Sequence, residues 1–380
     1  MHHNVRPVKT AIIGCGDISD IYFENLIHRF SIIDLVKCAS KGGISAQVKS
    51  EKYGIQNSTV EDIMADPEIE LIVNLTPAPA HYTLIHQALQ SGKHVYTEKV
   101  ITPEAENAKE LIELAKSKNL YLCSAPDHFL GSAWQHARDM IDRGMLGTVT
   151  SVYACVSQDM NVFADRLAFI NEPAGGIGFD FGIYLITEMV GLLGPVKEVC
   201  GIVETMYPNR IHKQITHPHF GESYTYVNED MMMGSLKFAS GAIGTIHLNG
   251  NSILSAPPQF LIYGTEGVLS LPNPGLFSGE MKLFRPGSFE PIEQISAFGF
   301  PHNSRGVGVA EMAWALRQNR TARTDVQLGS HCLEVLQGLQ ISSQTRQFYT
   351  LQSSCTRPEP LESGYRGMQT FAFDEEGAIV

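Results

Sequence analysis

The stretch Ala11-Ile12-Ile13-Gly14-Cys15-Gly16-Asp17-Ile18-Ser19 indicates the fold class of the chain. An apolar run ends at Gly14 and helical spacing begins at Asp17, so the glycines lie in a turn between a strand and a helix. The pattern G-x-G-x-x-S is close to the Rossmann fingerprint, with a tight turn at the first glycine and room for a pyrophosphate at the second. We predict that Gly14, Gly16, Asp17, Ile18 and Ser19 contact a dinucleotide whose phosphates face the helix N-terminus. The alternative is an ordinary glycine-rich turn.

The rest of the first third of the chain fits the same fold. Short apolar runs alternate with helical patterns, and the expected strands cover residues 8–14, 33–39, 70–75, 94–97 and 120–124. This alternation is typical of βαβ units, which form a parallel sheet with helices on both faces. We predict an α/β Rossmann domain over residues 1–125.

The pattern changes after about residue 124, where strand pairs dominate. Hairpins are predicted at 231–238/242–248 and 260–263/268–271, around short turns that contain glycine. Helices are expected near 132–143, 180–193, 307–318 and 327–342. These elements predict an α+β domain over residues 126–380 with a large, mostly antiparallel open sheet; the pattern does not place the tail 359–380.

Composition and charge exclude several classes of partner. The 380 residues carry a formal net charge of −12, which repels nucleic acid and gives no support to binding at an anionic membrane. No apolar run approaches the roughly 20 residues needed to span a bilayer, and no signal-peptide pattern opens the sequence. Seven scattered cysteines without a C-x-x-C pair suit a reducing compartment, so the expected location is the cytoplasm.

The end of the second strand bears on the choice of cofactor. An acidic residue there would hold the ribose 2′-hydroxyl of NAD, but this strand ends in Ser40-Lys41. A hydroxyl followed by a cation suits a 2′-phosphate, which favours NADP over NAD. The alternative is that Ser40 and Lys41 form a solvated loop and that selection lies elsewhere.

Three further segments complete a family resemblance. They are TPAPAH at 76–81, GKHVYTEK at 92–99 and GGIGFDFGIY at 175–184. With the glycine turn and the later run 303–313, they resemble the glucose–fructose oxidoreductase / inositol dehydrogenase (Gfo/Idh/MocA) family over nearly the whole chain. The resemblance implies that Thr76, Pro77, His81, Glu98 and Lys99 line the cofactor site. It also implies a homodimer or homotetramer that covers the open sheet.

Lys99 is the first candidate for a catalytic residue. It follows the predicted strand 94–97, at the edge where such folds bind ligands. A lysine there can act as a base towards a hydroxyl group, or its cation can stabilise an alkoxide, and Glu98 can orient Lys99 or the cofactor. The alternative is a surface lysine in a salt bridge. Val100 stands where the family has proline, which predicts a less pre-oriented lysine.

Asp180 and Tyr184 form the second catalytic candidate. They are four residues apart at the start of the predicted helix 180–193 and would share one face. The family usually has Asp and His at these places, and a tyrosine can still donate or accept a proton. The alternative for Tyr184 is an ordinary packed helix residue.

Other polar residues are weaker candidates. Asn303 and Arg305 could bind substrate hydroxyls, or could serve as a helix cap and a surface cation. His217 and His219 could suggest a metal, but a third ligand is not evident in the sequence, so no metal site is predicted.

These observations predict an NAD(P)-dependent oxidoreductase. It would transfer hydride between nicotinamide and a hydroxyl/carbonyl carbon of a sugar, glycoside or cyclitol. One alternative is a glycoside-cleaving or epimerising enzyme with an internally recycled, bound NAD(P). A further alternative is a non-catalytic NAD(P)-binding sensor.

Overall fold

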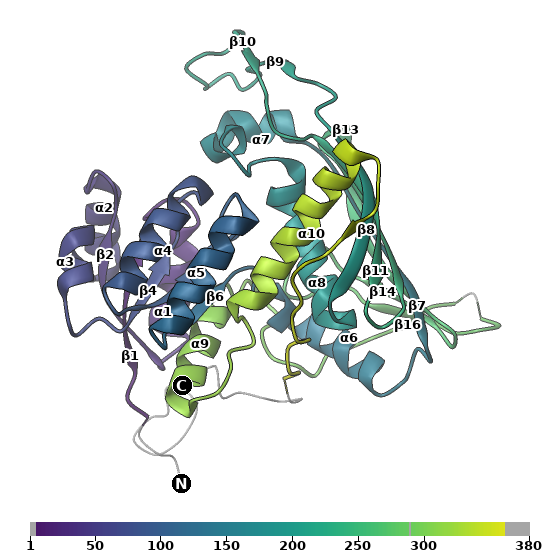
Figure 1. Cartoon of the computed structure of the whole chain (residues 1–380), viewed down its shortest axis with the longest axis horizontal. Helices are drawn as coiled ribbons and strands as arrows, with labels where there is room; N and C mark the ends of the chain where they lie inside the picture. The colour runs from purple at the N-terminus through teal and green to yellow at the C-terminus, as the bar shows by residue number, and fades with distance from the viewer. Residues whose placement is uncertain (1–4, 289, 362–380) are drawn as a thin grey trace. The chain divides into compact units, whose positions relative to one another are not determined.

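The computed structural model (Figure 1) describes residues 5–288 and 290–361, which form two compact units. The first unit consists of residues 5–130 together with Asn303–Gly329, and the second consists of Gly131–His302 together with Ser330–Leu361. Helix α9 (Val307–Gln318) thus belongs to the first unit, whereas the domains predicted from sequence, 1–125 and 126–380, are continuous. Most of the unplaced tail, residues 362–380, lies outside the described residues.

The first unit contains the predicted parallel sheet. Its order is β3-β2-β1-β4-β5-β6, and each neighbouring pair is parallel. The strands are β1 (Val8–Ile13), β2 (Ile33–Ala39), β3 (Gln56–Asn57), β4 (Leu71–Asn74), β5 (His94–Thr97) and β6 (Leu122–Ser124). The strand order reverses between β1 and β4, and ligands of such sheets bind at the carboxyl ends beside this point. The Rossmann prediction is therefore confirmed.

Helices separate these strands because apolar residues recur at helical spacing between them. They are α1 (Ser19–His28), α2 (Ile44–Tyr53), α3 (Val60–Ala65), α4 (His81–Gln90) and α5 (Ala105–Ser117). All four residues of β4 are buried. A strand without an exposed face is expected where helices cover both sides of a parallel sheet.

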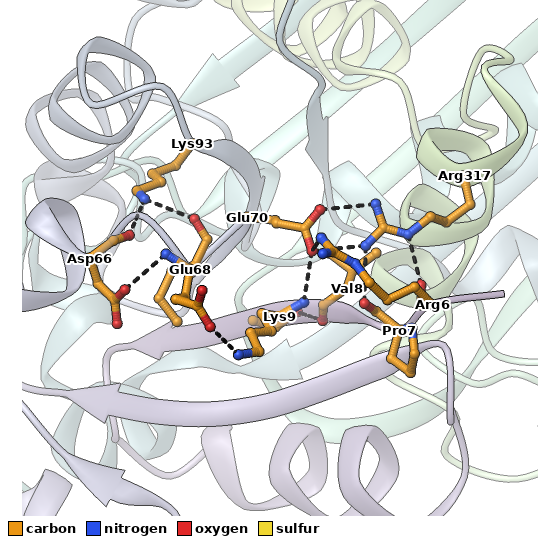
Figure 2. Close-up of polar contacts among 11 residues, drawn as sticks. Arg6, Pro7, Val8, Lys9, Asp66, Glu68, Glu70, Lys93 and Arg317 are labelled. Carbon is orange, nitrogen blue, oxygen red and sulfur yellow. Dashed lines mark hydrogen bonds and ion pairs between the residues drawn. The ribbon is translucent and has the colours of Figure 1, made fainter.

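An ion-pair network lies at the amino ends of β1 and β4 (Figure 2). The Arg317 guanidinium of α9 donates to both Glu70 carboxylate oxygens, at 2.8 and 2.9 Å. Arg317 also donates to the backbone carbonyls of Arg6 and Pro7 at 2.8 and 3.0 Å. Through these bonds the late helix α9 is attached to the first strand of the unit, at the edge opposite the carboxyl ends.

The second unit contains a nine-stranded sheet with the order β16-β15-β14-β13-β7-β12-β11-β8-β17. Only β7 and β12 pair in parallel among these strands; the other neighbours are antiparallel. The bounds are β7 (Val149–Asp159), β8 (Val196–Glu204), β11 (Met231–Phe238), β12 (Ile243–Asn249), β13 (Asn251–Gly264), β14 (Val268–Leu271), β15 (Lys282–Phe284), β16 (Ile292–Glu293) and β17 (Tyr349–Thr350). The predicted large, mostly antiparallel sheet is confirmed.

Helices pack closely on this sheet. The second unit contains α6 (Ser132–Asp142), α7 (Met160–Arg166), α8 (Ile183–Leu193) and most of α10 (Val326–Thr345). A Cβ atom placed on Gly201 of β8 or Gly234 of β11 would lie 2.7 or 2.3 Å from the Leu339 side chain of α10. Glycine at these two strand positions therefore lets α10 approach the sheet. No helix among the described residues is long and apolar enough to cross a membrane.

Two features differ from the sequence-based prediction of the second unit. A two-stranded hairpin, β9 (Asn209–Ile211) and β10 (Ser223–Thr225), leaves the sheet between β8 and β11, and the sequence pattern did not indicate it. The predicted helix 180–193 is α-helical only from Ile183, because Gly178–Gly182 forms a π-helical turn. A π turn has more residues per turn than an α-helix and so shifts the helical register. Asp180 and Tyr184 therefore do not have the i, i+4 alignment that was predicted for a continuous α-helix.

Candidate functional site

The glycine turn after β1 is shaped by close packing against β4. Gly14 has φ +103°, and a Cβ on it would lie 2.6 Å from the carbonyl carbon of Leu75. Any other residue there would collide with backbone, so Gly14 is required by the fold itself. Gly16 is different, since a Cβ there would meet nothing within 4 Å. The open space over Gly16 is the space that a pyrophosphate needs.

The remaining residues of the turn divide into buried and exposed positions. Ser19 is fully buried, and its hydroxyl donates to the Gly16 carbonyl at 2.6 Å. It therefore closes the turn from inside. Asp17 and Ile18 are exposed at the start of α1. The predicted cofactor residues of the glycine turn thus lie together at the carboxyl end of β1.

A cavity of about 540 Å³ lies at the end of β2. It is lined by Cys15, Ser40, Lys41, Gly42, Ile44, Ser45, Val48 and Lys49. The Ser40 oxygen accepts a hydrogen bond from Ala46 N at 3.1 Å, near the N-terminus of α2. Ile44 and Val48 are 81% and 56% exposed, so they offer apolar surface beside two lysine side chains. The lining therefore combines apolar side chains with the cations of Lys41 and Lys49 beside the N-terminus of α2.

The segment after β4 is held by side chains to the segment after β5. Asn74 Oδ1 accepts from the backbone N–H and the hydroxyl of Thr76, at 3.2 and 2.7 Å. The buried His81 ring lies 2.7 Å from the carbonyl oxygens of both Thr76 and Val100. Two carbonyl partners favour a doubly protonated ring, whereas burial lowers the pKa of His81. Pro77 lies in the connected segment, directly before the short helix η1 (Ala78–Ala80).

Glu98 and Lys99 lie immediately after β5. Glu98 Oε1 accepts from the Tyr22 hydroxyl at 2.7 Å, and Oε2 accepts from the backbone N–H of Lys99 at 2.9 Å. The Lys99–Val100 peptide bond is cis, and the Val100 carbonyl is bonded to His81. Although valine replaces the family's proline, these hydrogen bonds fix the backbone on both sides of the half-buried Lys99.

Three polar residues near the Glu98–Lys99 pair were not predicted from the sequence. Tyr22 holds Glu98 from α1. Asp127 Oδ2 accepts from the backbone N–H groups of Gly306 and Gly308, and burial raises the pKa of Asp127 to about 6. Burial, together with the charges of Arg305 and Lys99, holds the pKa of His128 well below its usual range. Asp127 and His128 follow β6, so the rule that ligands bind at strand ends could have identified them.

The run 303–308 completes this part of the first unit. Asn25 of α1 donates to the carbonyl oxygens of Asn303 and Arg305 at 3.0 and 2.8 Å. Arg305 donates to the Asn303 side chain at 2.9 Å. Arg305 is close enough to influence the pKa of His128, so this run belongs to the same polar cluster as Lys99.

Asp180 and Tyr184 lie in the second unit. Asp180 is about nine-tenths buried in the π turn, and Tyr184 is half-buried in the first turn of α8. The preceding glycines pack against Glu229, whose carboxylate accepts from Gly178 N at 3.0 Å. Burial raises the pKa of Glu229 to about 7. Glu229 is a further titratable residue that the sequence pattern did not reveal.

The chain belongs to the GFO/IDH/MocA family. Residues 8–125 match the description "Oxidoreductase family, NAD-binding Rossmann fold", and residues 134–270 match the GFO/IDH/MocA C-terminal domain. The family resemblance stated from the sequence motifs is therefore confirmed.

Several curated relatives are sugar or cyclitol dehydrogenases. D-glucoside 3-dehydrogenase of Escherichia coli is 28% identical over 62% of this chain and 68% of its own length. scyllo-Inositol 2-dehydrogenase (NAD(+)) of Bacillus subtilis is 26% identical over 70% of this chain and 73% of its own. An uncharacterized oxidoreductase of Schizosaccharomyces pombe is 29% identical over 53% of this chain and 56% of its own. For relatives such as the last, the chain spans little more than half of their length.

A solved structure shows the same fold. Levoglucosan dehydrogenase in its apo form superposes with a TM-score of 0.80 at 18% identity, covering 92% of this chain and 100% of that one. At this identity the similarity concerns the fold alone.

Proposed function

We propose that this protein is an NAD(P)-dependent dehydrogenase or reductase acting on a hydroxyl/carbonyl carbon of a sugar, glycoside or cyclitol. The observation that carries the proposal is the Glu98–Lys99 pair. It lies at the carboxyl end of β5 in the sheet that also bears the glycine turn. The dehydrogenases of glucosides and inositol among the relatives support the substrate class.

A nicotinamide dinucleotide bound at the glycine turn would accept or supply the hydride. When an alcohol is oxidised, the Lys99 amine takes the proton of the hydroxyl group while the hydride leaves the carbon that bears this group, and a carbonyl forms. In the reverse direction the Lys99 ammonium returns the proton to the oxygen. Glu98 acts as a positioning residue, because its carboxylate binds the backbone of Lys99 and is itself held by Tyr22. For Asp180 and Tyr184 we propose hydrogen bonding or proton transfer to the substrate.

The decisive experiment measures cofactor reduction by absorbance with a panel of sugars, glycosides and cyclitols. We expect one class to give turnover, and Lys99→Ala to lower kcat on the order of 10²-fold or more. Lys118→Ala, which removes an exposed lysine after α5, serves as the matched control and should behave as wild type. Sugar conversion without net cofactor reduction would favour the recycled-cofactor alternative. Nucleotide binding without turnover on any substrate would favour the non-catalytic sensor.

Within this function we propose NADP as the preferred cofactor. The cavity at the end of β2 presents Lys41 and Lys49 together with the hydroxyls of Ser40 and Ser45. Lys49 also pairs with Asp20 at 2.6 Å, which leaves Lys41 as the principal cation for a 2′-phosphate. Hydrogen bonds to charged groups contribute about 1.5–3 kcal/mol each, or roughly 10- to 150-fold in affinity.

Titration with NADP and NAD tests this preference directly. Lys41→Ala should weaken NADP binding at least about tenfold and leave NAD binding nearly unchanged. The control Lys116→Ala removes an exposed lysine of α5 and should change neither affinity. Equal losses for both nucleotides, or tighter binding of NAD by wild type, would contradict the proposal.

We further propose a homodimer or homotetramer in the cytoplasm. Large apolar side chains are exposed on the open sheet, among them Ile202 of β8 and Ile243 of β12, at 68% and 56%. Exposed apolar surface of this kind is typical of protein interfaces. Sedimentation velocity of wild type and of Ile243→Lys measures the assembly, and a monomer at micromolar concentration would contradict it.

A further inference from the structure

A group of histidines surrounds a buried carboxylate in the second unit, and the proposed dehydrogenase does not use it. His212, His217 and His219 follow β9, and Asp165 lies in α7. One possible ligand atom from each of Asp165, His212 and His217 lies within 4.8 Å of the others. In Figure 1 the hairpin β9–β10 extends beyond α7, so the group lies where the hairpin meets this helix.

The Asp165 carboxylate is fixed in place with one oxygen directed at an imidazole. Its side chain is completely buried, and Oδ2 accepts from the backbone N–H groups of Lys213 and Gln214 at 2.5 and 2.8 Å. Oδ1 lies 2.6 Å from Nδ1 of His212. Two backbone amides donate to Oδ2, so Oδ1 is the oxygen that can bind an ion together with His212.

His217 brings a second imidazole to the same place. Its ring stacks on that of His212 with the centroids 4.0 Å apart and the planes 15° from parallel. His217 Nδ1 accepts a hydrogen bond from the backbone N–H of His219 at 3.2 Å. The lone pair of Nδ1 is used in this bond, so Nε2 is the ring nitrogen that can bind another partner. Stacked rings cannot both direct a lone pair at one ion, so binding requires a rotation of the half-buried His217 side chain.

We propose that Asp165, His212 and His217 form a binding site for a divalent transition-metal ion of the Zn²⁺ class. Two imidazole nitrogens and one carboxylate oxygen suit Zn²⁺, whereas Mg²⁺ and Ca²⁺ prefer oxygen ligands alone. Zn²⁺ bonds to nitrogen and oxygen are about 2.0–2.2 Å long, so ligand atoms that already lie within 4.8 Å of one another can reach one ion once the His217 side chain rotates. The ion takes the place of the hydrogen bond between Asp165 and His212.

The bound ion joins α7 to the hairpin loop. Tyr224 of β10 stacks on the other face of His212 at 4.3 Å, and its hydroxyl donates to Asn161 of α7 at 3.1 Å. Asn161 and Asp165 are four residues apart on α7, so they present one face of the helix to the hairpin. The metal replaces the Asp165–His212 hydrogen bond with stronger metal–ligand bonds, beside the hydrogen bonds that Lys213, Gln214 and Tyr224 donate to α7.

Zinc titration of the full-length protein tests the site. His2 and His3 are first replaced by alanine in every protein, because terminal histidines can also bind metals. After dialysis against a chelator, calorimetry with Zn²⁺ should show one ion per chain, and His217→Ala should weaken binding at least about tenfold. His28→Ala removes an exposed histidine of α1 and should bind like its parent. Co²⁺ should give the visible absorption bands of a tetrahedral site in the parent but not in His217→Ala.

The outcomes separate this site from the dehydrogenase. Zn²⁺ should raise the Tm of the parent protein and of Lys99→Ala equally, because Lys99 is not part of the metal site. His217 lies in a loop and its loss should leave circular dichroism unchanged, so weaker binding reports on the ligand itself. No stoichiometric Zn²⁺ binding by the parent, or unchanged binding by His217→Ala, overturns the proposal.

Discussion

The two sheets of this protein use their side chains in different ways. In the first unit β4 is buried at all four positions, because helices cover both faces of the parallel sheet. In the second unit β12 alternates between exposed and buried residues along its length. The first sheet therefore offers its ends to a ligand, and the second offers a face. We therefore expect that stability and ligand binding depend mainly on backbone geometry in the cofactor region of the first unit. In the second unit we expect them to depend mainly on side-chain chemistry.

The largest effect is expected from a substitution that disrupts the backbone geometry of the first unit. Gly14→Ala places a Cβ at positive φ and 2.6 Å from the Leu75 backbone. We expect a loss of about 3 kcal/mol in the free energy of unfolding, together with loss of nucleotide binding. Denaturant unfolding and calorimetric nucleotide titration measure the two effects.

Gly16→Ala is the matched control for Gly14→Ala. A Cβ on Gly16 meets nothing within 4 Å, so the free energy of unfolding should change little. Nucleotide affinity should still fall, because the methyl group enters the space over the turn. Equal destabilisation by both substitutions would contradict the distinct roles of the two glycines.

The contrast also explains how much of the fold could be predicted from the sequence. Five strands of the first unit were predicted to within two residues, because buried strands form continuous apolar runs with glycine or proline between them, whereas the short polar strand β3 was missed. Strand β8 and the hairpin β9–β10 were not predicted. Strand β8 pairs with β11 and β17, which lie much later in the chain, whereas β9 and β10 pair with each other. All three strands carry mixed polar sequences without a clear period.

The candidate sites show the same limit. The residues in motifs, from Gly14 to Lys99, could be proposed because local sequence determines their turns. Tyr22 and Asp127 act through hydrogen bonds across the fold, to Glu98 and to Gly306. The histidine pair His217 and His219 was visible in the sequence, but Asp165 was not connected with it because that carboxylate lies far earlier in the chain.

The next effect tests side-chain chemistry in the second unit. Burial raises the pKa of Glu229 to about 7, above its ordinary value of 4.5. Between these values the folded state binds more protons than the unfolded state, so stability falls as the pH rises. A separation of roughly 2.5 pKa units corresponds to about 3 kcal/mol. Glu229→Gln should remove this pH dependence and be more stable than wild type at pH 8.

The measurement is the free energy of unfolding for both proteins between pH 4 and pH 8. The difference between the two curves isolates Glu229 from the other titrating groups. Glutamine retains an oxygen that can accept from Gly178, so the substitution preserves that hydrogen bond. Parallel curves over this range would show that Glu229 ionises normally in the folded protein.

A smaller effect concerns the orientation of Lys99, the proposed catalytic residue, by Glu98 in the first unit. Tyr22→Phe removes the hydroxyl that donates to Glu98 at 2.7 Å. We expect a loss of about 1.5–3 kcal/mol in stability, since the acceptor is a charged group. If Glu98 positions Lys99, kcat should also fall about tenfold while KM changes little.

Tyr121→Phe provides the comparison for Tyr22→Phe. Its hydroxyl donates to the Arg320 carbonyl at 3.0 Å, away from Glu98. This variant should lose some stability but keep the kcat of wild type. A fall in kcat of the same size in both variants would mean that Tyr22 supports the fold and not the positioning of Lys99.

The smallest effect lies at the opposite edge of the first sheet, in the network of Figure 2. Arg317→Lys retains the charge but loses the two-fold hydrogen bond to Glu70, and should cost about 1 kcal/mol or less. Burial raises the pKa of Glu70, but the bonds and charge of Arg317 outweigh this and hold it below its ordinary value. The contribution is therefore present above the unfolded pKa of about 4.5 and is lost as the pH falls.

The exposed pair Lys9–Glu68 in the same network calibrates this last prediction. Its side chains are 41% and 69% exposed, against 19% and 22% for Arg317 and Glu70. Lys9→Met should leave the free energy of unfolding unchanged at any salt concentration, because water screens the pair. If Arg317→Lys is equally silent at pH 7, the two-fold hydrogen bond to Glu70 does not hold α9 to the sheet, and its attachment rests on apolar packing and on the hydrogen bonds from Gly306 and Gly308 to Asp127.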